Sequence, residues 1–474
     1  MSSQEISPRK KAIVFVHPDL GIGGAERLVI DAATALQSRG YAVTILTSHC
    51  DPDHCFPEAR DGTLDVRVRG DAILPLSLAG RFGILLAVLR QMALVLSTAV
   101  FSSEIRQLDP DVLIVDQLSA SVPMFRVLHP RAKILFYGHF PDRLLARPDG
   151  GLLGMVKRLY RLPFDKLESW STACADEIIV NSKYTRSVFR STFPGLKSRE
   201  LKVIYPCVNT LHELVHGPRP IWCDRKILLS INRYEGKKDL DLAIHAFAGL
   251  SDQERRRARL VIAGGYDHRV TENAKTLEYL QHIADLHQLS HATLSESEFD
   301  SSLNGSEIIF LLSISHAMKR RLLQSASLLI YTPKNEHFGI VPLEAMAAEV
   351  PVLATDTGGP LETIYDGRTG WLRSPSKIGS WTEIMRKPLL PSNTDSLKVM
   401  GQRGRDRVIR DFSHTRMGSA LDERLHDLCS DVSYRPRLVS PWLFAALCVV
   451  ILAGTLRLIF GFGMQIAPQV SSSH

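Results

Sequence analysis

The sequence predicts an α/β fold made of two Rossmann-like domains, each built on an open parallel sheet. Short apolar runs typical of buried strands alternate with segments of helical periodicity, and this alternation starts twice along the 474 residues. The first series begins at "AIVFV" after Lys11, and the second begins at "KILLSIN". The linker "CVNTLHELVHGPRPIWCD", near residues 206–224, separates them. We therefore expect an N-terminal domain at 10–206 and a C-terminal domain at 225–430.

The order of the expected elements predicts parallel strands in both domains. In the first, the strand "AIVFV" leads through the loop "HPDLGIGGAE" into the helix "RLVIDAATALQSRG", which Gly40 closes, and then into "YAVTILT". Further strands are expected at "DVLIVD", "KILFYG", "EIIVNS" and "KVIYP". The second series contains the helix "DLDLAIHAFAGL" and the strands "RLVIAGG", "SLLIYTP" and "PVLATD". Open parallel sheets bind ligands beyond the carboxyl ends of their strands, so both sheets should present those ends to a cleft.

Composition favours anionic partners and disfavours several classes of protein. The net charge is +7 and the pI is near 9.0, which suits phosphates or lipid headgroups. The basic residues are spread along the chain without a concentrated tract, so we expect no nucleic-acid partner. The seven cysteines are scattered and form no C-x-x-C pair, which disfavours a zinc site or a disulfide framework and fits a reducing compartment.

Two hydrophobic segments predict a membrane-associated protein with a cytosolic body. Residues 441–463 are apolar apart from Thr455 and Arg457, over roughly 30 Å of helix, the thickness of a bilayer core. Arg435 and Arg437 precede this segment, so the positive-inside rule places the body in the cytosol. The N-terminal apolar run is too short for a signal peptide. The segment 72–101 carries Arg81 and Arg90 on opposite sides of a helix, so we expect it to pack on its domain and touch a membrane rather than span it.

The glycine-rich loop after the first strand predicts an anion site at a helix N-terminus. Gly21, Gly23 and Gly24 let the backbone approach a ligand, and the helix that follows offers free N–H groups. A dinucleotide dehydrogenase would need a glycine where Glu26 stands and an acid near Thr47. We therefore do not expect a nicotinamide cofactor.

Cations and a histidine follow other strands. Arg233 and Lys238 lie in "INRYEGKKDLDLAI", between a strand and a helix, where they can neutralise a diphosphate or simply form a solvated turn. His139 lies in "LFYGHFPD", just past a strand end, and is either structural or part of a polar ligand site.

Two carboxylates, Glu336 and Glu344, stand eight positions apart in "NEHFGIVPLEAM". A single helix would not superpose them, and Gly339 and Pro342 argue against one. We expect a loop from Glu336 to Val341 and a helix that starts near Pro342, with Glu344 in its first turn. The exposed amides of such a loop suit phosphate, and the two acids suit sugar hydroxyls. Helix capping by Glu344 is the simpler alternative.

The stretch "NEHFGIVPLEAMAAEVPVLATDTGGPLETI" resembles the signature of retaining glycosyltransferases of the GT-B architecture, in which seven residues separate two glutamates. "GIGGAE" and "NRYEGKKDLDLAI" are similar to two further signatures of that family. "HFPD", the segment 72–101 and "INRYEGKKDL" resemble the members that add the second and third mannoses of the dolichol-linked oligosaccharide. The resemblance covers about residues 10–430.

This resemblance implies roles for residues at matching positions. Glu336, His139 and Lys238 would be catalytic, with Glu336 on the donor mannose and His139 on the acceptor or departing-group side. Glu344 would contact the guanosine ribose. The donor would be held by Gly23, Gly24, Arg233, Lys238, Gly339, Ile340, Val341 and Glu344. Gly358, Gly359 and Glu362 would lie in a second glycine loop.

The resemblance also implies the reaction and its partners. Mannose would pass from GDP-mannose to a dolichol-diphosphate oligosaccharide at the endoplasmic reticulum membrane, with retention, and other mannosyltransferases of the pathway would be neighbours. No cofactor and no obligatory metal are expected, since the Asp-x-Asp triplets at 51–53, 109–111 and 239–241 look like chance matches. Two alternatives remain, namely a lipid-directed transferase with a different nucleotide sugar and an inactive membrane scaffold.

Overall fold

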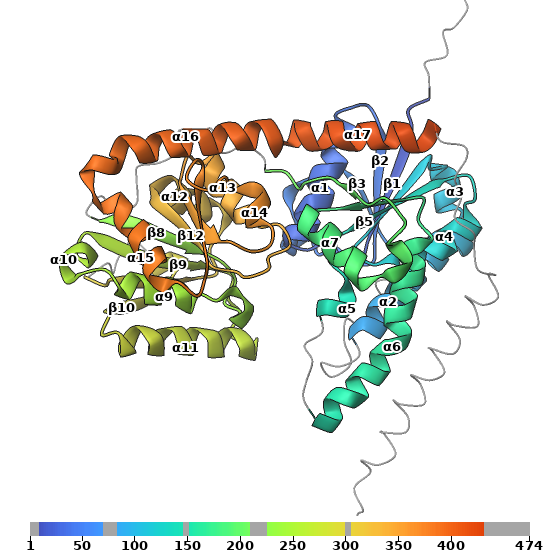
Figure 1. The fold of residues 1–474 in the computed structure, drawn as a ribbon. Coiled ribbons are helices and arrows are strands. Elements are labelled where there is room, and N and C mark those ends of the chain that lie inside the picture. Colours follow the sequence, from blue (N-terminus) through green and yellow to red (C-terminus); the bar gives the residue numbers. More distant parts are fainter. Residues whose placement is uncertain (1–8, 70–82, 146–150, 209–224, 299–304, 431–474) are drawn as a thin grey trace, which may run out of the picture. The chain divides into compact units, whose positions relative to one another are not determined.

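The computed structural model describes the chain except for residues 1–8, 70–82, 146–150, 209–224, 299–304 and 431–474 (Figure 1). The chain divides into two compact units. The first comprises the described parts of Met1–Ile179, Val188–Lys202 and Asp422–His474, and the second comprises those of Val180–Ser187 and Val203–Leu421. The first unit thus includes residues from Asp422 onward, near the end of the chain, whereas the sequence predicts each domain as one continuous segment.

The sheet of the first unit has the strand order β3-β2-β1-β4-β5-β6-β7. The direction of the strand order reverses between β1 and β4. The pairs β1–β2, β1–β4 and β4–β5 are all parallel. Its strands are β1 (Ala12–His17), β2 (Ala42–Thr47), β3 (Asp65–Val68), β4 (Val112–Asp116), β5 (Lys133–Gly138), β6 (Glu177–Val180) and β7 (Lys202–Val203). The helices connecting them are α1 (Gly24–Gln37), α2 (Gly83–Val95), α3 (Glu104–Leu108), α4 (Val122–Leu128), α5 (Asp142–Leu145), α6 (Gly151–Ala173) and α7 (Lys183–Thr192).

The sheet of the second unit has the order β10-β11-β9-β8-β12-β13-β14, and all of its pairs are parallel. Its strands are β8 (Lys226–Ile231), β9 (Ala258–Gly264), β10 (His291–Ser295), β11 (Ile308–Leu312), β12 (Ala326–Tyr331), β13 (Val352–Thr355) and β14 (Gly370–Arg373). The helices are α9 (Asp241–Ala248), α10 (Asp252–Arg255), α11 (Thr271–Leu286), α12 (His316–Ser325), α13 (Ile340–Ala347), α14 (Pro360–Thr363), α15 (Ile378–Arg386), α16 (Thr394–Asp411) and α17 (His414–Ser430), whose last residues belong to the first unit.

The second sheet is buried on both faces, which explains why its central strands read as unbroken apolar runs. In β8, Leu228 joins the cluster that contains Phe247 of α9, whereas Ile227 and Leu229 join the cluster that contains Leu343 of α13. Successive strand residues point to opposite faces, so both sets of side chains are removed from water. Each buried Leu or Ile contributes roughly 1.5–3 kcal/mol to folding. The predicted Rossmann-like architecture is confirmed.

Four strands were not predicted from the sequence. Three of them contain polar or half-exposed residues and lie at sheet edges. β3 is an edge strand of the first sheet, and β10 and β14 are the two edge strands of the second sheet. Edge strands are covered less completely, so the apolar signal is weaker there. The fourth, β11, is an apolar run beside β10 and is buried along most of its length.

The segment 72–101 is described from Gly83 onward, where it forms α2 and a short π-helical turn, Leu96–Val100. Leu85 and Val88 pack against Phe164 and Leu167 of α6. Within the described residues, Gly83–Val100 is the one helix long and apolar enough to cross a bilayer, and half of it is buried in the protein. That combination is weak evidence for a span. The predicted membrane segment 441–463 lies outside the described residues, as does Arg81.

Candidate functional site

The loops after β8 and β12 bring the predicted cation and the first predicted carboxylate together. These strands are neighbours at the centre of the second sheet, where ligands bind open parallel sheets. Lys238 ends a short 3₁₀ turn after β8, and Glu336 lies in the loop after β12. The Lys238 Nζ atom is 2.5 Å from Glu336 Oε2. Thr332 donates to the backbone carbonyl of Lys238 at 2.6 Å, which ties the two loops together.

Glu336 is ionised at neutral pH. Its side chain is 20% exposed and that of Lys238 is 13% exposed, so the pair is largely shielded from solvent. Burial alone would raise the pKa of Glu336, but the positive charge and hydrogen bond of Lys238, with smaller contributions from His337 and the Tyr331 hydroxyl, lower it overall. An ionised carboxylate accepts hydrogen bonds and cannot donate them. Glu336 is therefore built to accept from hydroxyl groups, not to act as a general acid.

The second glycine loop supports the backbone of the Glu336 loop. Gly359 N–H donates to the carbonyl of Glu336 at 2.7 Å, and Asn335 N–H donates to Thr357 at 3.2 Å. Gly358 has φ +71, and a Cβ there would lie 2.6 Å from the Glu336 carbonyl oxygen. A side chain at Gly358 would thus displace the catalytic candidate. These glycines are needed for close contact between two loops.

The helix after Glu336 starts earlier than predicted. Gly339 is its N-cap residue with φ +84, and α13 begins at Ile340 rather than near Pro342. Proline is tolerated at its third position because the first N–H groups of a helix lack partners within it. Glu344 consequently lies in the second turn, and the prediction that placed it in the first turn was wrong. The N–H groups of Ile340 and Val341 belong to the free end of α13, as the predicted donor site requires.

Glu344 forms an ion pair that the sequence did not predict. Lys319 of α12 places its Nζ atom 2.5 Å from Glu344 Oε1, and both side chains are mostly buried. The other oxygen, Oε2, is buried and receives no hydrogen bond within the described part of the chain. A buried acceptor without a donor is costly, so Oε2 is suited to a ligand hydroxyl. The simpler capping role does not fit, since Glu344 lies beyond the first turn.

Arg233 is not drawn into the Lys238–Glu336 pair. Its guanidinium lies 2.9 Å from Glu235, whose other oxygen pairs with Lys237 at 3.0 Å. The Arg233 side chain is 64% exposed, so its pair with Glu235 is weak and its guanidinium is accessible to a ligand. Glu362, in contrast, accepts from the N–H groups of Lys183 and Tyr184 and so caps α7.

In the first unit, the predicted glycine loop carries its own carboxylate. Gly23 is the N-cap of α1 and Gly24 is its first residue. The carboxylate of Glu26 folds back over this end, where a Cβ on Gly23 would lie 2.2 Å from its oxygen. A negative group at a helix N-terminus is favoured by the helix dipole. An incoming phosphate would therefore compete with Glu26 for the same end of α1.

His139 belongs to a cluster of three ionisable side chains. Its Nε2 atom lies 2.6 Å from Asp116 Oδ1, and His17 Nδ1 lies 2.8 Å from Asp116 Oδ2. His17 and Asp116 end the neighbouring strands β1 and β4, and His139 follows β5. His139 was predicted as a candidate, but the residues that hold it were not.

Four residues beside the candidates were missed, and only some left a signal in the sequence. Asp116 and His17 are polar ends of apolar strands, a pattern that could have selected them once β1 and β4 were known to be neighbours. Tyr331 is the polar end of the predicted strand β12, a few residues before Glu336, so it left the same kind of signal, whereas Lys319 is brought to Glu344 by tertiary structure alone.

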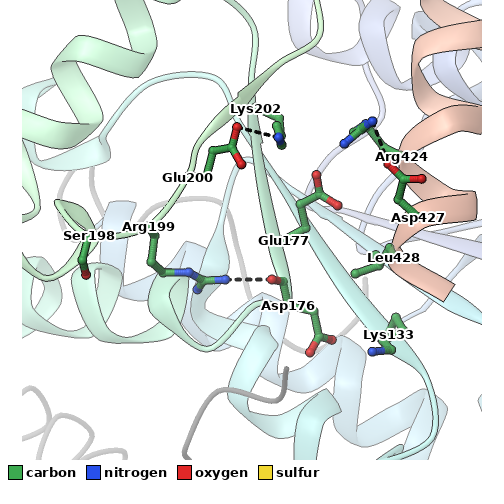
Figure 2. Close-up of a pocket in the computed structure, with 10 residues that line it drawn as sticks. All are labelled: Lys133, Asp176, Glu177, Ser198, Arg199, Glu200, Lys202, Arg424, Asp427 and Leu428. Atoms are coloured by element: carbon green, nitrogen blue, oxygen red, sulfur yellow. Dashed lines mark hydrogen bonds and ion pairs between the residues drawn. The ribbon is translucent and has the colours of Figure 1, made fainter. Parts of the chain in front are cut away.

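A cavity of about 560 Å³ in the first unit lies at the opposite, amino-terminal edge of its sheet (Figure 2). Lys133 and Glu177, the first residues of β5 and β6, line it. Its acidic and basic side chains are similar in number and largely neutralise one another, as in the pairs Lys202–Glu200 and Arg424–Asp427 (Figure 2). It therefore offers no excess charge for a phosphate, and we assign it no ligand.

Two family patterns match the chain. The pattern of the Glycosyltransferase Family 4 covers residues 22–211, and that of the Glycosyl transferases group 1 covers residues 218–407. Among solved structures, sucrose-phosphate synthase from Thermosynechococcus elongatus has a TM-score of 0.66 at 17% identity, over 88% of this chain and 99% of the other. WaaG, a glycosyltransferase involved in lipopolysaccharide biosynthesis, has a TM-score of 0.58 at 16% identity, over 87% of this chain and 99% of the other. At these identities the likeness establishes the GT-B fold alone.

Full-length relatives are much more similar in sequence. Alpha-1,3/1,6-mannosyltransferase alg-2 of Neurospora crassa is 51% identical over 426 residues, which cover 87% of this chain and 90% of the relative. The protein of the same name from Saccharomyces cerevisiae is 41% identical over 464 residues, covering 92% of this chain and 88% of the relative. The chain therefore belongs to the alpha-1,3/1,6-mannosyltransferase family of GT-B glycosyltransferases.

Proposed function

We propose that this protein transfers mannose from GDP-mannose to a dolichol-diphosphate-linked oligosaccharide, with retention at the anomeric carbon, and makes alpha-1,3 and alpha-1,6 linkages in N-glycan precursor synthesis. Family membership supports the transfer of mannose. The observation that carries the chemistry is the shielded Lys238–Glu336 pair at the centre of the second sheet. Lys238 provides a positive charge and Glu336 accepts hydrogen bonds from hydroxyl groups, and both lie beyond the carboxyl ends of the strands, where open parallel sheets bind ligands.

The reaction requires stabilisation of a departing diphosphate. The bond from the anomeric carbon to the diphosphate oxygen breaks, the acceptor hydroxyl adds on the same face, and its proton passes to the departing diphosphate. The transition state has oxocarbenium character, so negative charge grows on the diphosphate. Lys238 and the free N–H groups of Ile340 and Val341 are preorganised to meet that charge. Arg233 supplies a second, exposed cation.

The two glutamates hold different parts of the donor. Glu336, kept ionised beside Lys238, accepts from hydroxyls of the mannose and places negative charge near the developing cation. Glu344 Oε2, which lacks a donor among the described residues, accepts from the ribose. We assign His139 to the acceptor or departing-group side and Gly23 and Gly24 to the phosphates.

The protein cations take the place that a divalent metal holds in other transferases. Among the described residues, no three His, Cys, Asp or Glu side chains gather in a group that could hold a metal ion. Because Lys238 and Arg233 can meet the diphosphate charge themselves, we expect transfer by the purified protein to persist in excess EDTA. Loss of activity in EDTA, with recovery on addition of magnesium, would show that a metal is required.

An apolar helix face supports action at a membrane surface. The first half of α6 extends away from the sheet of its unit (Figure 1). On it, Met155, Val156, Leu159 and Leu162 recur at helical spacing and are each at least half exposed. Arg158 lies beside them and is exposed. Apolar side chains edged by a basic residue fit the headgroup region of an anionic bilayer. We assign this surface to the cytosolic face of the endoplasmic reticulum, where it meets a lipid-linked acceptor.

The test is transfer by purified protein to a one-mannose dolichol-diphosphate acceptor, with GDP-mannose or UDP-sugars as donor. We expect product with GDP-mannose alone. Product with a UDP-sugar alone would identify a different lipid-directed transferase, and no product with any donor, from protein that is folded, would indicate an inactive scaffold.

A further inference from the structure

One carboxylate in the first unit is shared by two histidines at the point where the strand order reverses. Asp116 ends β4, and His17 ends the adjacent strand β1. Asp116 Oδ2 lies 2.8 Å from His17 Nδ1, and Asp116 Oδ1 lies 2.6 Å from His139 Nε2. The reversal point is where open parallel sheets bind their ligands. The cluster is therefore placed for function, not only for packing.

The carboxylate fixes the protons of both imidazoles. Burial opposes ionisation of Asp116, but the charges and hydrogen bonds of His139 and His17 outweigh it and lower its pKa to about 2. An ionised carboxylate only accepts, so His17 Nδ1 and His139 Nε2 must both carry protons. A neutral His139 is then protonated at Nε2, and any proton that it gains is bound at Nδ1.

Only one member of the cluster is accessible. The His17 and Asp116 side chains are 0% and 1% exposed, whereas that of His139 is 17% exposed. The other ring nitrogen of His17, Nε2, lies 4.0 Å from the carboxylate of Glu26. That carboxylate also covers Gly23 at the start of α1. Asp116 and His17 are thus out of reach of a substrate and can influence it only through His139 or α1.

We propose that Asp116 is a positioning residue for His139, holding the imidazole in one orientation and one tautomer at the ligand-binding edge of the first sheet, and that His17 holds Asp116 in place from the opposite side. This inference rests on the proposed function, because it assumes that His139 acts on bound substrate. Groups that act as a unit give non-additive losses when they are removed together.

The test is a double-mutant cycle on mannose transfer with D116N and H139A. The two imidazoles contact different oxygens of Asp116, and D116N replaces one of these oxygens with an NH2 donor, so one imidazole N–H group loses its acceptor. We expect D116N to lower kcat about 10- to 100-fold, the loss typical of carboxylates that orient a metal-binding histidine in the same way, with little change in the KM for GDP-mannose. In the H139A background, D116N should have no further effect on kcat. Equal fold losses with and without His139 would refute the positioning role.

A buried aspartate just before β6, at the amino-terminal edge of the same sheet, provides the control. Asp176 pairs with Arg126 at 2.7 Å and accepts from Ile134 N–H at 2.7 Å, near the amino end of β5 and away from the cluster. D176N removes a buried charge as D116N does, so both should lower the melting temperature. Only D176N should give the same fold effect on kcat in the wild-type and H139A backgrounds.

Nitrogen-15 NMR of histidine-labelled wild-type protein tests the tautomer without any turnover. The neutral ring of His139 should carry its proton on Nε2, the atom that faces Asp116, and a proton on Nδ1 of the neutral ring would refute the proposal even if D116N does not fold. Absence of transfer by the wild-type protein would instead contradict the proposed function, so the two failures are distinguishable.

Discussion

Replacing Lys238 by Met should destabilise the second unit through the charge that it leaves behind. The Lys238–Glu336 pair has an N–O distance of 2.5 Å and side chains that are 13% and 20% exposed. Exposed pairs contribute about 0–1 kcal/mol, and removal of one partner from a buried pair costs about 3–5 kcal/mol. This pair lies between those limits, so we expect a loss of about 2 kcal/mol at pH 7. For a domain of 150–250 residues that lowers the melting temperature by about 4–8 °C.

The loss should depend on pH in a direction that the structure dictates. Lys238 lowers the folded-state pKa of Glu336, so Glu336 contributes stability above its unfolded pKa, and this contribution is lost as pH falls through the lowered folded pKa. In K238M that lowering is removed, and burial then raises the pKa of Glu336. The difference in melting temperature between the wild type and K238M should therefore be largest near pH 7 and shrink towards pH 4.

The assay is thermal unfolding of detergent-solubilised protein at several pH values, with transfer measured in parallel. K237M is the matched control, because the neighbouring Lys237 pairs with Glu235 but is 57% exposed. Its effect should stay below about 1 kcal/mol and depend little on pH. Loss of Lys238 should also lower kcat about 10²- to 10³-fold if it meets charge on the departing diphosphate. Equal melting shifts for K238M and K237M, or a K238M shift that grows on acidification, would refute this reasoning.

Three further perturbations test the supporting parts of the account. G358A should lower both the melting temperature and kcat, because its Cβ would lie 2.6 Å from the Glu336 carbonyl oxygen. Gly367 also has a positive φ, +72, but has open space around it. G367A should therefore show only the cost of the positive φ, about 1–2 kcal/mol, with near-normal kcat. Glu344→Gln should raise the KM for GDP-mannose about tenfold, equivalent to about 1.4 kcal/mol, with a smaller change in kcat, and an unchanged KM in steady-state kinetics would remove Glu344 from the donor site. Leu159→Asp should weaken sedimentation of the protein with anionic vesicles. Leu286, an exposed leucine of the second unit, is the control, and Leu286→Asp should not weaken it. Equal binding by both variants would show that the α6 surface does not contact the membrane.

The fold was predictable because its central strands are covered on both faces. "KILLSIN" and "DVLIVD" are apolar at nearly consecutive positions, and short runs of this kind between helices are typical of parallel strands that are buried on both faces. The edge strands β3 and β10 carry no comparable signal, since one of their sides meets solvent. The boundary of α13 was misjudged because Gly339, not Pro342, provides the turn into the helix.

The candidate site was predictable one residue at a time, but not as a set of contacts. Glu336 and Lys238 could be selected because each follows a strand, yet their contact joins loops 98 positions apart. The Asp116 cluster required the order of β1, β4 and β5, which local periodicity does not specify. Lys319 lies on a helix surface whose contact with Glu344 depends on the packing of α12 beside α13.

The central claim is that the Lys238–Glu336 site transfers mannose from GDP-mannose with retention. The most direct measurement is an NMR determination of linkage and anomeric configuration in the product that purified protein forms from labelled GDP-mannose and a one-mannose dolichol-diphosphate acceptor, with E336A run beside the wild type. We predict alpha-1,3- and alpha-1,6-linked mannose from the wild type and a large loss of product from E336A. A beta-linked product, or undiminished transfer by E336A, would contradict the account.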